Sequence, residues 1–172
     1  IDTRAITRKI RVQGTMRGVI APEGEEEKAR ALIAGYEEHN QVAQVTTPET
    51  YVMDNDGPHV VVLDMGIKRN ILLSMHNMGF KLTVMPAFTK TEEIKALNPD
   101  GLFFSNGPGE PKDVPETIET IRQLVGYKPM FGICLGHQLL CLALGGDTYK
   151  MKFGHRGVNH PVKDFTTGKV EI

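Results

Sequence analysis

One short segment, residues 130–144, constrains the fold of this chain more than any other, because it places a cysteine at a sharp turn from strand to helix. The apolar residues before Gly132 are typical of a buried strand, and the leucine-rich residues after Gly136 are typical of a helix. Between them, Gly132-x-Cys134-x-Gly136 has the spacing of a nucleophile elbow, with sulfur in place of a serine hydroxyl. We therefore expect Cys134 at the carboxyl end of a strand in an α/β fold.

The predicted turn also favours nucleophilic chemistry. A thiol at a helix N-terminus lies near unpaired amides and the positive end of the helix dipole, and both favour the thiolate over the thiol. The backbone amide of Leu135, directly after Cys134, is then placed to stabilise an oxyanion. A lone cysteine is more often a buried apolar residue. The combination of strand, glycine-flanked cysteine and helix nevertheless predicts a nucleophile.

The composition argues against several classes of function. The chain has 172 residues, a net charge of −1 and a pI near 6.7, so charge gives no basis for binding nucleic acid or membranes. No apolar run is long enough to span a bilayer, and the first residues do not resemble a signal peptide. Cys134 and Cys141 are too far apart on one predicted helix for a disulfide, and two reduced thiols favour a cytoplasmic location. Because residue 1 is not methionine, we expect a piece of a longer protein.

The pattern of the sequence changes near residue 58. Before it, we predict a mildly helical segment from Thr3 to Ile10 and an amphipathic helix over residues 22–39. Residues 40–58 are polar and rich in turn-forming residues, which indicates a linker or irregular surface. We interpret residues 1–57 as the end of an N-terminal domain plus a linker.

From residue 59 onward, short apolar runs alternate with helical patterns. Strands are predicted at residues 60–63, 82–85, 102–104 and 130–133, and helices at 68–78, 89–97, 114–125 and 135–144. Such alternation predicts an open, mostly parallel sheet flanked by helices, built from right-handed crossovers. Functional residues of such sheets lie at the carboxyl ends of the strands. Cys134 and the loop at residues 106–109 both fall there.

Four blocks carry a resemblance to a known family: Cys134–Gln138 with its flanks, Ser105–Pro111, Asp64–Leu72 and Met151–Pro161. The first two resemble the class I glutamine amidotransferases. The last two, with residues 1–10, resemble the small, glutaminase subunits of carbamoyl-phosphate synthetases within that family. The resemblance covers nearly the whole chain. It implies that residues 58–172 are an amidotransferase domain truncated at its C-terminal end, and that residues 1–57 end the small subunit's N-terminal domain.

This resemblance also implies a mechanism and a site. Cys134 would attack the carboxamide of glutamine, giving a glutamyl thioester and ammonia. The amides of Gly107 and Leu135 would hold the oxyanion, and the glutamine would contact Gly107, Gly109, Leu135 and Gln138. Asn-Gly-Pro-Gly by itself is more typical of an ordinary turn. Its place at a strand end neighbouring the elbow favours the oxyanion role.

A cysteine amidase also needs a general base, usually a histidine oriented by a carboxylate. His137 is near the thiol in sequence, but a base must approach from the substrate side, so we do not assign it. In the resembled family, base and carboxylate lie in a His-Pro-Glu block that would follow Ile172. His155 and His160 match no catalytic position, and we interpret them as structural or surface residues. We expect this chain to be inactive alone.

The resemblance further implies L-glutamine as the substrate, and as the partner it implies a large synthetase subunit. That subunit would receive ammonia through an internal tunnel and use bicarbonate, ATP and Mg²⁺. The chain itself has no phosphate-binding Gly-x-x-x-x-Gly-Lys-Ser/Thr loop, so we expect no cofactor and no metal in it. Whether the product serves arginine or pyrimidine biosynthesis stays open.

Two alternatives remain. The chain could serve another synthetase, of the anthranilate, GMP or CTP type, but Lys68-Arg69-Asn70 and the Met151–Pro161 block weigh against this. It could also be a non-catalytic structural subunit, since the triad histidine and glutamate are absent. The presence of Cys134 with both glycine loops weighs against that interpretation.

Overall fold

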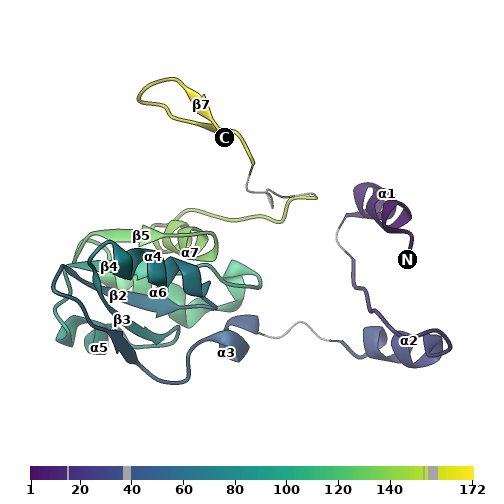
Figure 1. Cartoon of the computed structure of the whole chain (residues 1–172), viewed down its shortest axis with the longest axis horizontal. Coiled ribbons are helices and arrows are strands. Elements are labelled where there is room, and N and C mark those ends of the chain that lie inside the picture. Colours follow the sequence, from purple (N-terminus) through teal and green to yellow (C-terminus); the bar gives the residue numbers. More distant parts are fainter. Residues whose placement is uncertain (15, 37–39, 153, 155–158) are drawn as a thin grey trace. The chain divides into compact units, whose positions relative to one another are not determined.

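The computed structural model of the chain describes residues 1–14, 16–36, 40–152, 154 and 159–172. It divides into two compact units (Figure 1). The larger unit is Glu38–Thr148 and contains Cys134, and the smaller unit combines Ile1–Glu37 with Tyr149–Ile172.

A five-stranded sheet forms the centre of the larger unit, in the order β1-β3-β2-β4-β5. The strands are β1 (Tyr51–Met53), β2 (His59–Asp64), β3 (Lys81–Pro86), β4 (Gly101–Phe104) and β5 (Met130–Gly132). β2 pairs in parallel with β3 and β4, β4 pairs in parallel with β5, and β1 runs antiparallel to β3. This confirms the predicted open, mostly parallel sheet. The central strand β2 is buried from Val61 to Asp64, as expected where helices cover both faces.

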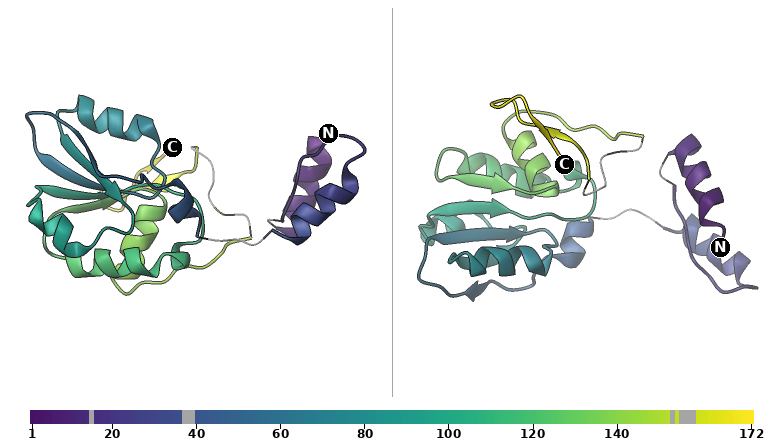
Figure 2. Two further views of the ribbon diagram at one scale, coloured as in Figure 1. Left: turned by 90° about the horizontal axis from the view of Figure 1, so that it is seen from below. Right: turned by 45° about the horizontal axis from the view of Figure 1, so that its top comes forward.

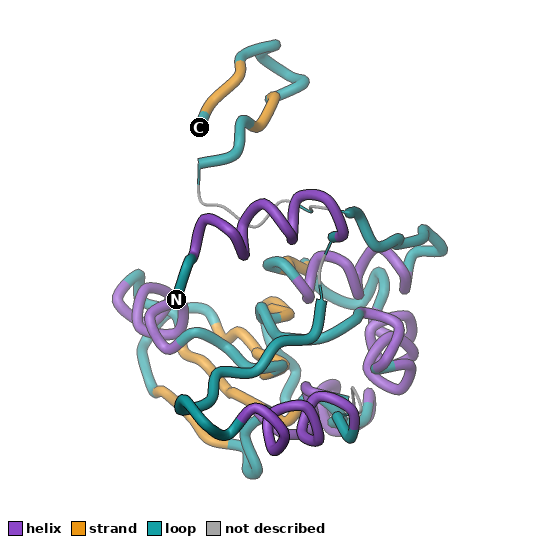
Figure 3. The backbone as a smooth tube through the Cα atoms, turned by 90° about the vertical axis from the view of Figure 1, so that its right-hand side faces the viewer, coloured by secondary structure: helices purple, strands orange, loops and turns teal. Residues whose placement is uncertain are grey.

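Five α-helices belong to the described part of the larger unit: α3 (Gln41–Val45), α4 (Arg69–Asn77), α5 (Thr91–Ala96), α6 (Pro115–Leu124) and α7 (Leu135–Ala143). Figure 2 shows α4 on one side of the sheet and α6 and α7 on the other, and Figure 3 shows the strands between the helices. Alternate residues of β2 point to opposite faces. Val62 therefore joins the core beneath α4, whereas Val61 and Leu63 join the larger core beneath α5, α6 and α7.

Two predictions for the first sixty residues are wrong. Residues 40–58 are not a linker, because they contain α3 and β1, and Tyr51 pairs opposite Val84 of β3. The amphipathic helix predicted over residues 22–39 is the shorter α2 (Glu26–Ala34), which ends at Gly35. Residues 37–39 lie outside the described part of the chain. The domain boundary near residue 57 stays a prediction. The boundaries of the two compact units fall at other positions along the chain, because α3 and β1 belong to the unit that contains the sheet.

Thr89 and Glu92 have the spacing of a capping box, but the structure forms the corresponding bond one residue later, at the start of α5. The amide of Lys90 donates to Oε1 of Glu93 at 3.3 Å. The Thr89 hydroxyl instead donates to the carbonyl oxygen of Pro86 at 2.7 Å. The chain between β3 and α5 therefore closes its own tight turn before the helix begins.

The smaller unit contains α1 (Thr3–Gln13), α2, and a hairpin of β6 (Val162–Lys163) and β7 (Val170–Glu171). The hairpin was not predicted from the sequence. Asp164 fixes its turn by accepting hydrogen bonds from Thr166 and Thr167, and these bonds lower the pKa of Asp164 to about 2. No helix in the described part of the chain is long and apolar enough to cross a membrane.

Titration of His59, the first residue of β2, is expected to make the free energy of unfolding depend on pH. Its Nε2 lies 2.8 Å from the Thr83 hydroxyl, and burial, aided by the charge of Lys81, lowers the pKa of His59 below its ordinary 6.5 despite the opposing charge of Asp100. The unfolded chain then binds more protons than the folded chain. The stabilising contribution of His59 is therefore present above pH 6.5, the ordinary pKa of histidine. It is lost as the pH falls from 6.5 through the lowered pKa of His59 in the folded chain.

We expect the free energy of unfolding, measured by urea denaturation between about pH 5 and pH 8, to fall as the pH is lowered below the ordinary histidine pKa. His59→Gln removes this part of the dependence, because glutamine does not titrate. Identical pH dependence of the parent and the variant would contradict the assignment.

Candidate functional site

Cys134 adopts a strained backbone conformation at the turn between β5 and α7. Its φ is 53° and its ψ is −109°. A positive φ in a residue other than glycine costs about 1–3 kcal/mol and persists only where the surrounding structure enforces it. The sharp turn predicted from the glycine-flanked cysteine is therefore confirmed. It leaves the thiol exposed at the N-terminus of α7, whereas Cys141 is half-buried.

The glycines on either side of Cys134 allow backbone segments to touch. A methyl group on Gly136 would lie 2.1 Å from the carbonyl oxygen of Phe104, and one on Gly132 would lie 2.5 Å from the carbonyl carbon of Gly136. The Gly136 amide donates to the carbonyl oxygen of Ser105 at 3.0 Å, and the Ile133 amide donates to that of Phe104 at 3.1 Å. The end of β4 thus holds the elbow directly, backbone to backbone.

The loop after β4 brings Gly107 against the elbow. A methyl group on Gly107 would lie 2.9 Å from Cδ2 of Leu135 and 2.2 Å from the carbonyl oxygen of Met65. Within the described part of the chain, neither the amide of Gly107 nor that of Leu135 donates a hydrogen bond. The two amides predicted to hold an oxyanion therefore belong to adjoining residues and have no protein acceptor there. Their catalytic role stays a prediction.

The loop after β2 is closed by a buried carboxylate. Oδ1 of Asp64 accepts from the amides of Gly66 at 2.8 Å and Ile67 at 2.7 Å, and Oδ2 accepts from the amide of Thr47 at 2.9 Å. The Thr46 hydroxyl donates to the carbonyl oxygen of Asp64 at 2.6 Å. Asp64 therefore joins the loop after β2 to the end of α3, a segment that the sequence pattern indicated to be linker.

Ser105 and Asn106 connect the loops after β2 and β4, and no role was predicted for either side chain. The Ser105 hydroxyl accepts from the Met65 amide at 2.8 Å and donates to the carbonyl oxygen of Asn106 at 2.7 Å. The Asn106 side chain accepts from the Lys68 amide at 3.1 Å and donates to the carbonyl oxygen of Gly66 at 3.2 Å. A usable signal was present, because Ser105 directly follows an apolar strand and Asn106 comes next.

The two other residues predicted to contact substrate lie near the elbow in different ways. Gln138 is exposed on α7, and its amide donates to the carbonyl oxygen of Cys134 at 3.1 Å, which places it one helical turn after the nucleophile. Gly109 is exposed with a φ of 92°, and its position lies against Gln41 of α3. A side chain on Gly109 would be strained in this conformation. Substrate contact by Gln138 and Gly109 stays a prediction.

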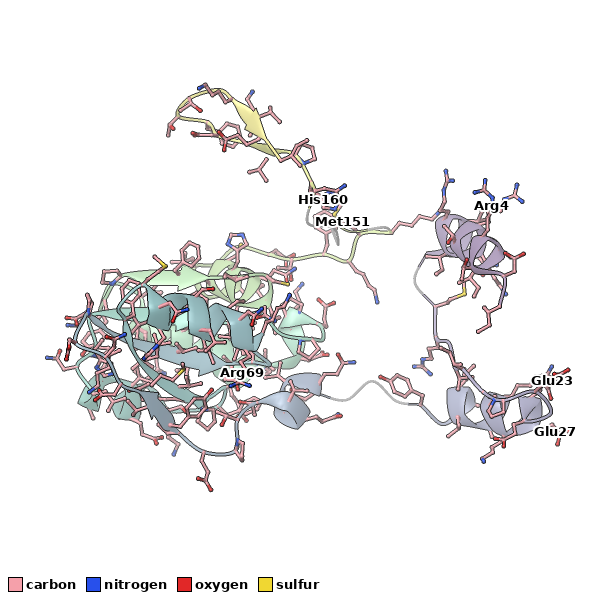
Figure 4. The ribbon with its side chains drawn as sticks, viewed as in Figure 1. Arg4, Glu23, Glu27, Arg69, Met151 and His160 are labelled. Atoms are coloured by element: carbon pink, nitrogen blue, oxygen red, sulfur yellow. The ribbon has the colours of Figure 1, made fainter. Side chains whose placement is uncertain are left out.

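The structure describes two of the three histidines considered from the sequence, and their exclusion from catalysis stays a prediction. His137 is exposed on α7. His155 lies outside the described residues, and His160 is half-buried in the smaller unit, where Figure 4 labels it with Met151. Among the residues that the structure describes, no group of three His, Cys, Asp or Glu side chains could hold a metal ion.

An apolar groove of about 670 Å³ lies elsewhere, beside α4 and along β4 and β5. Its lining includes Met75, Phe103 and Phe131, and Phe131 is 64% exposed. Neither Cys134 nor Gly107 lines it. An apolar wall offers few partners to a carboxamide and an amino acid's charged groups, so this groove is not the candidate site.

Comparison with known proteins agrees with this geometry. The family model for class I glutamine amidotransferases matches residues 61–172. The chain belongs to the class I glutamine amidotransferase family. This membership fits the strained Cys134 of the larger unit, since the matched residues include both the elbow and the loop that carries Gly107.

Among curated proteins, this chain is 48% identical to "Carbamoyl phosphate synthase small chain" of Listeria monocytogenes (strain F2365), over all of this chain and 48% of that protein. It is 47% identical to the small chain of Methanopyrus kandleri, over all of this chain and 50% of that protein. It is also 47% identical to the "pyrimidine-specific small chain" of Lactiplantibacillus plantarum, over all of this chain and 47% of that protein. The chain spans about half the length of these relatives.

One solved structure, of a protein from Thermoplasma acidophilum described as a GMP synthase component, aligns with a TM-score of 0.49 and 19% identity. The alignment covers 64% of this chain and 53% of that chain. This similarity is too low to support an argument about this chain.

Because α7 and β4 are in close contact, we expect an added methyl group at this contact to change the free energy of unfolding. Gly136→Ala is expected to lower the free energy of unfolding by about 1–3 kcal/mol or more, because the added methyl collides with the fixed carbonyl of Phe104. Helix propensity alone predicts the opposite sign, a gain of up to about 1 kcal/mol. Urea denaturation followed by circular dichroism measures the difference.

Gly101→Ala is the matched control for Gly136→Ala. A methyl group at Gly101 in β4 meets its nearest atoms at 3.7 and 3.8 Å, which is ordinary contact. We expect a change of less than about 1 kcal/mol for this variant. Equal losses in the two variants would show that the close contact at Gly136 is not what limits stability.

Proposed function

We propose that this chain is the nucleophile-bearing part of the glutaminase subunit of a carbamoyl-phosphate synthase. The observation that carries the proposal is the strained, exposed Cys134. Its neighbour Leu135 adjoins Gly107 and has an amide that donates no hydrogen bond to any residue the structure describes. The naming of the relatives as carbamoyl phosphate synthase small chains supports the choice of synthase. Glutamine is the proposed substrate.

In the proposed reaction, the sulfur of Cys134 attacks the carboxamide carbon of glutamine and a C–S bond forms. The amide oxygen becomes an oxyanion, which the N–H groups of Gly107 and Leu135 stabilise. The C–N bond then breaks, ammonia leaves with the proton it gains, and a glutamyl thioester remains. Water hydrolyses the thioester to glutamate and restores the thiol. The proton transfers need a general acid–base group, for which the proposal assigns no residue of this chain.

The remainder of the proposal concerns the partner. Ammonia is captured by a large synthetase subunit in the cytoplasm, and that subunit binds the ATP and Mg²⁺ that the synthesis of carbamoyl phosphate consumes. The word "small" in the names of the relatives supports a larger partner chain. An uncharged ammonia molecule is lost to solvent unless it is confined, so the reaction favours a complex over two separate enzymes.

Labelling with a diazoketone analogue of glutamine tests the glutaminase part. We expect the adduct on Cys134 and not on the half-buried Cys141, because only Cys134 lies at the exposed elbow. Excess L-glutamine should slow the labelling, and Cys134→Ala should abolish it. Mass spectrometry of the digested protein locates the adduct. Equal labelling of both cysteines, or labelling that glutamine does not slow, would contradict a glutamine site at Cys134.

Co-expression with the large carbamoyl-phosphate synthase subunit of the same organism tests the partner. We expect the two chains to elute together from a size-exclusion column, and Cys134→Ala, which changes the chemistry but not the fold, to elute in the same way. Separate elution of the two chains would contradict the partner assignment. It would leave the glutaminase assignment to the labelling experiment.

A further inference from the structure

We propose that Ser105 is a positioning residue that orients the Gly107 amide for the oxyanion. The inference rests on the proposed function, because it assumes that Gly107 is an oxyanion donor. Ser105 is fully buried, with 0% of its surface exposed, directly after β4. Its hydroxyl donates to the carbonyl oxygen of Asn106 at 2.7 Å and accepts from the Met65 amide at 2.8 Å.

The carbonyl that Ser105 holds belongs to the same peptide group as the N–H of Gly107. A peptide group is planar, and the described part of the chain has no cis peptide bond, so the C=O and N–H of this unit point in opposite directions in one plane. A hydrogen bond that fixes the Asn106 carbonyl therefore fixes the direction of the Gly107 amide. Ser105 acts on the amide without touching the substrate.

The Gly107 amide needs this hydrogen bond because glycine itself restricts the backbone little. Glycine has wide access to backbone conformations, so the peptide group between Asn106 and Gly107 can rotate unless something holds it. A side chain at position 107 cannot restrain this rotation, because a methyl group there would lie 2.2 Å from the carbonyl oxygen of Met65 and collide with it. The hydroxyl of the preceding Ser105 supplies the restraint from the other end of the same peptide group.

Ser105 is itself held from both sides. Its amide donates to the carbonyl oxygen of Leu63 in β2 at 3.2 Å, and its carbonyl oxygen accepts from the Gly136 amide at 3.0 Å. Gly136 lies two residues after Cys134. The same residue therefore fixes the position of the elbow through its backbone and the direction of the Gly107 amide through its hydroxyl.

The test compares two reactions of Cys134 that differ in their need for an oxyanion donor. Acylation by p-nitrophenyl acetate passes through a tetrahedral oxyanion before p-nitrophenolate leaves. Alkylation by iodoacetamide displaces iodide directly and forms no oxyanion. Loss of one oxyanion-hole donor typically slows catalysis by about 10²–10³-fold, so loss of its orientation in Ser105→Ala should slow acylation by about 10–100-fold. The alkylation rate should stay within about twofold, since nothing in that step uses the Gly107 amide.

Thr117→Val is the matched control. Thr117 is also fully buried, and its hydroxyl also donates to a backbone carbonyl, that of Ala87 at 2.9 Å, but it lies in α6. This variant loses a comparable buried hydrogen bond, so it should lose stability without changing the ratio of acylation to alkylation. If Ser105→Ala does not fold, Ser105→Cys keeps the volume with a weaker donor, and its ratio should fall in the same direction. Mass spectrometry confirms that Cys134 carries the label.

The outcomes separate the inference from the function on which it rests. If Cys134 of the parent chain shows the same ratio of acylation to alkylation as glutathione, the oxyanion donors of the proposed function are absent. If the parent ratio exceeds that of glutathione but the Ser105 variants keep it, the positioning role is wrong and the function stands. A fall of the ratio in Thr117→Val equal to that in Ser105→Ala would also overturn the positioning role.

Discussion

The backbone contact between α7 and the end of β4 is the interaction on which the rest of the site depends. Gly136 allows this contact, because any side chain there would overlap the Phe104 carbonyl oxygen, and its amide completes it by donating to Ser105. The strained φ of Cys134 is the consequence, since β5 and α7 must join over a very short turn. The strain is stored where the buried core beneath α5, α6 and α7 can support it.

Three loops form the candidate site around Cys134. Among the described residues, they are joined by hydrogen bonds and not by a network of charged side chains. The loop after β5 presents the thiol, the loop after β4 presents Gly107, and the loop after β2 supplies the Met65 amide and the Gly66 carbonyl that hold the β4 loop. The carboxylate of Asp64 accepts from amides of its own loop and of Thr47. Electrostatic stabilisation in the proposed reaction therefore comes from oriented backbone amides, which cost little to pre-arrange in a rigid sheet.

The sequence predicted most of the sheet and the elbow, because both depend on local patterns. The apolar run at residues 60–63 and the spacing of Gly132, Cys134 and Gly136 need no distant information to be interpreted. The errors lie where tertiary contacts override composition. Residues 40–58 are polar, yet β1 forms there because β3 offers an open edge, and α3 is kept in place by the bonds that Thr46 and Thr47 make to Asp64.

The sequence by itself determined that this chain has an α/β sheet with a glycine-flanked cysteine at a strand end, since residue type and spacing fix a strand-to-helix turn within a few residues. Tertiary structure alone decided which loops meet. Gly107 and Leu135 are 28 residues apart in the chain but adjoin across β4 and β5. From the sequence, Ser105 is only a polar residue after a strand. Its proposed role depends on the hydrogen bonds that its hydroxyl makes with the Met65 amide and the Asn106 carbonyl in the folded chain. Sequence patterns record local backbone preferences, whereas hydrogen bonds between loops depend on the order of strands in the sheet.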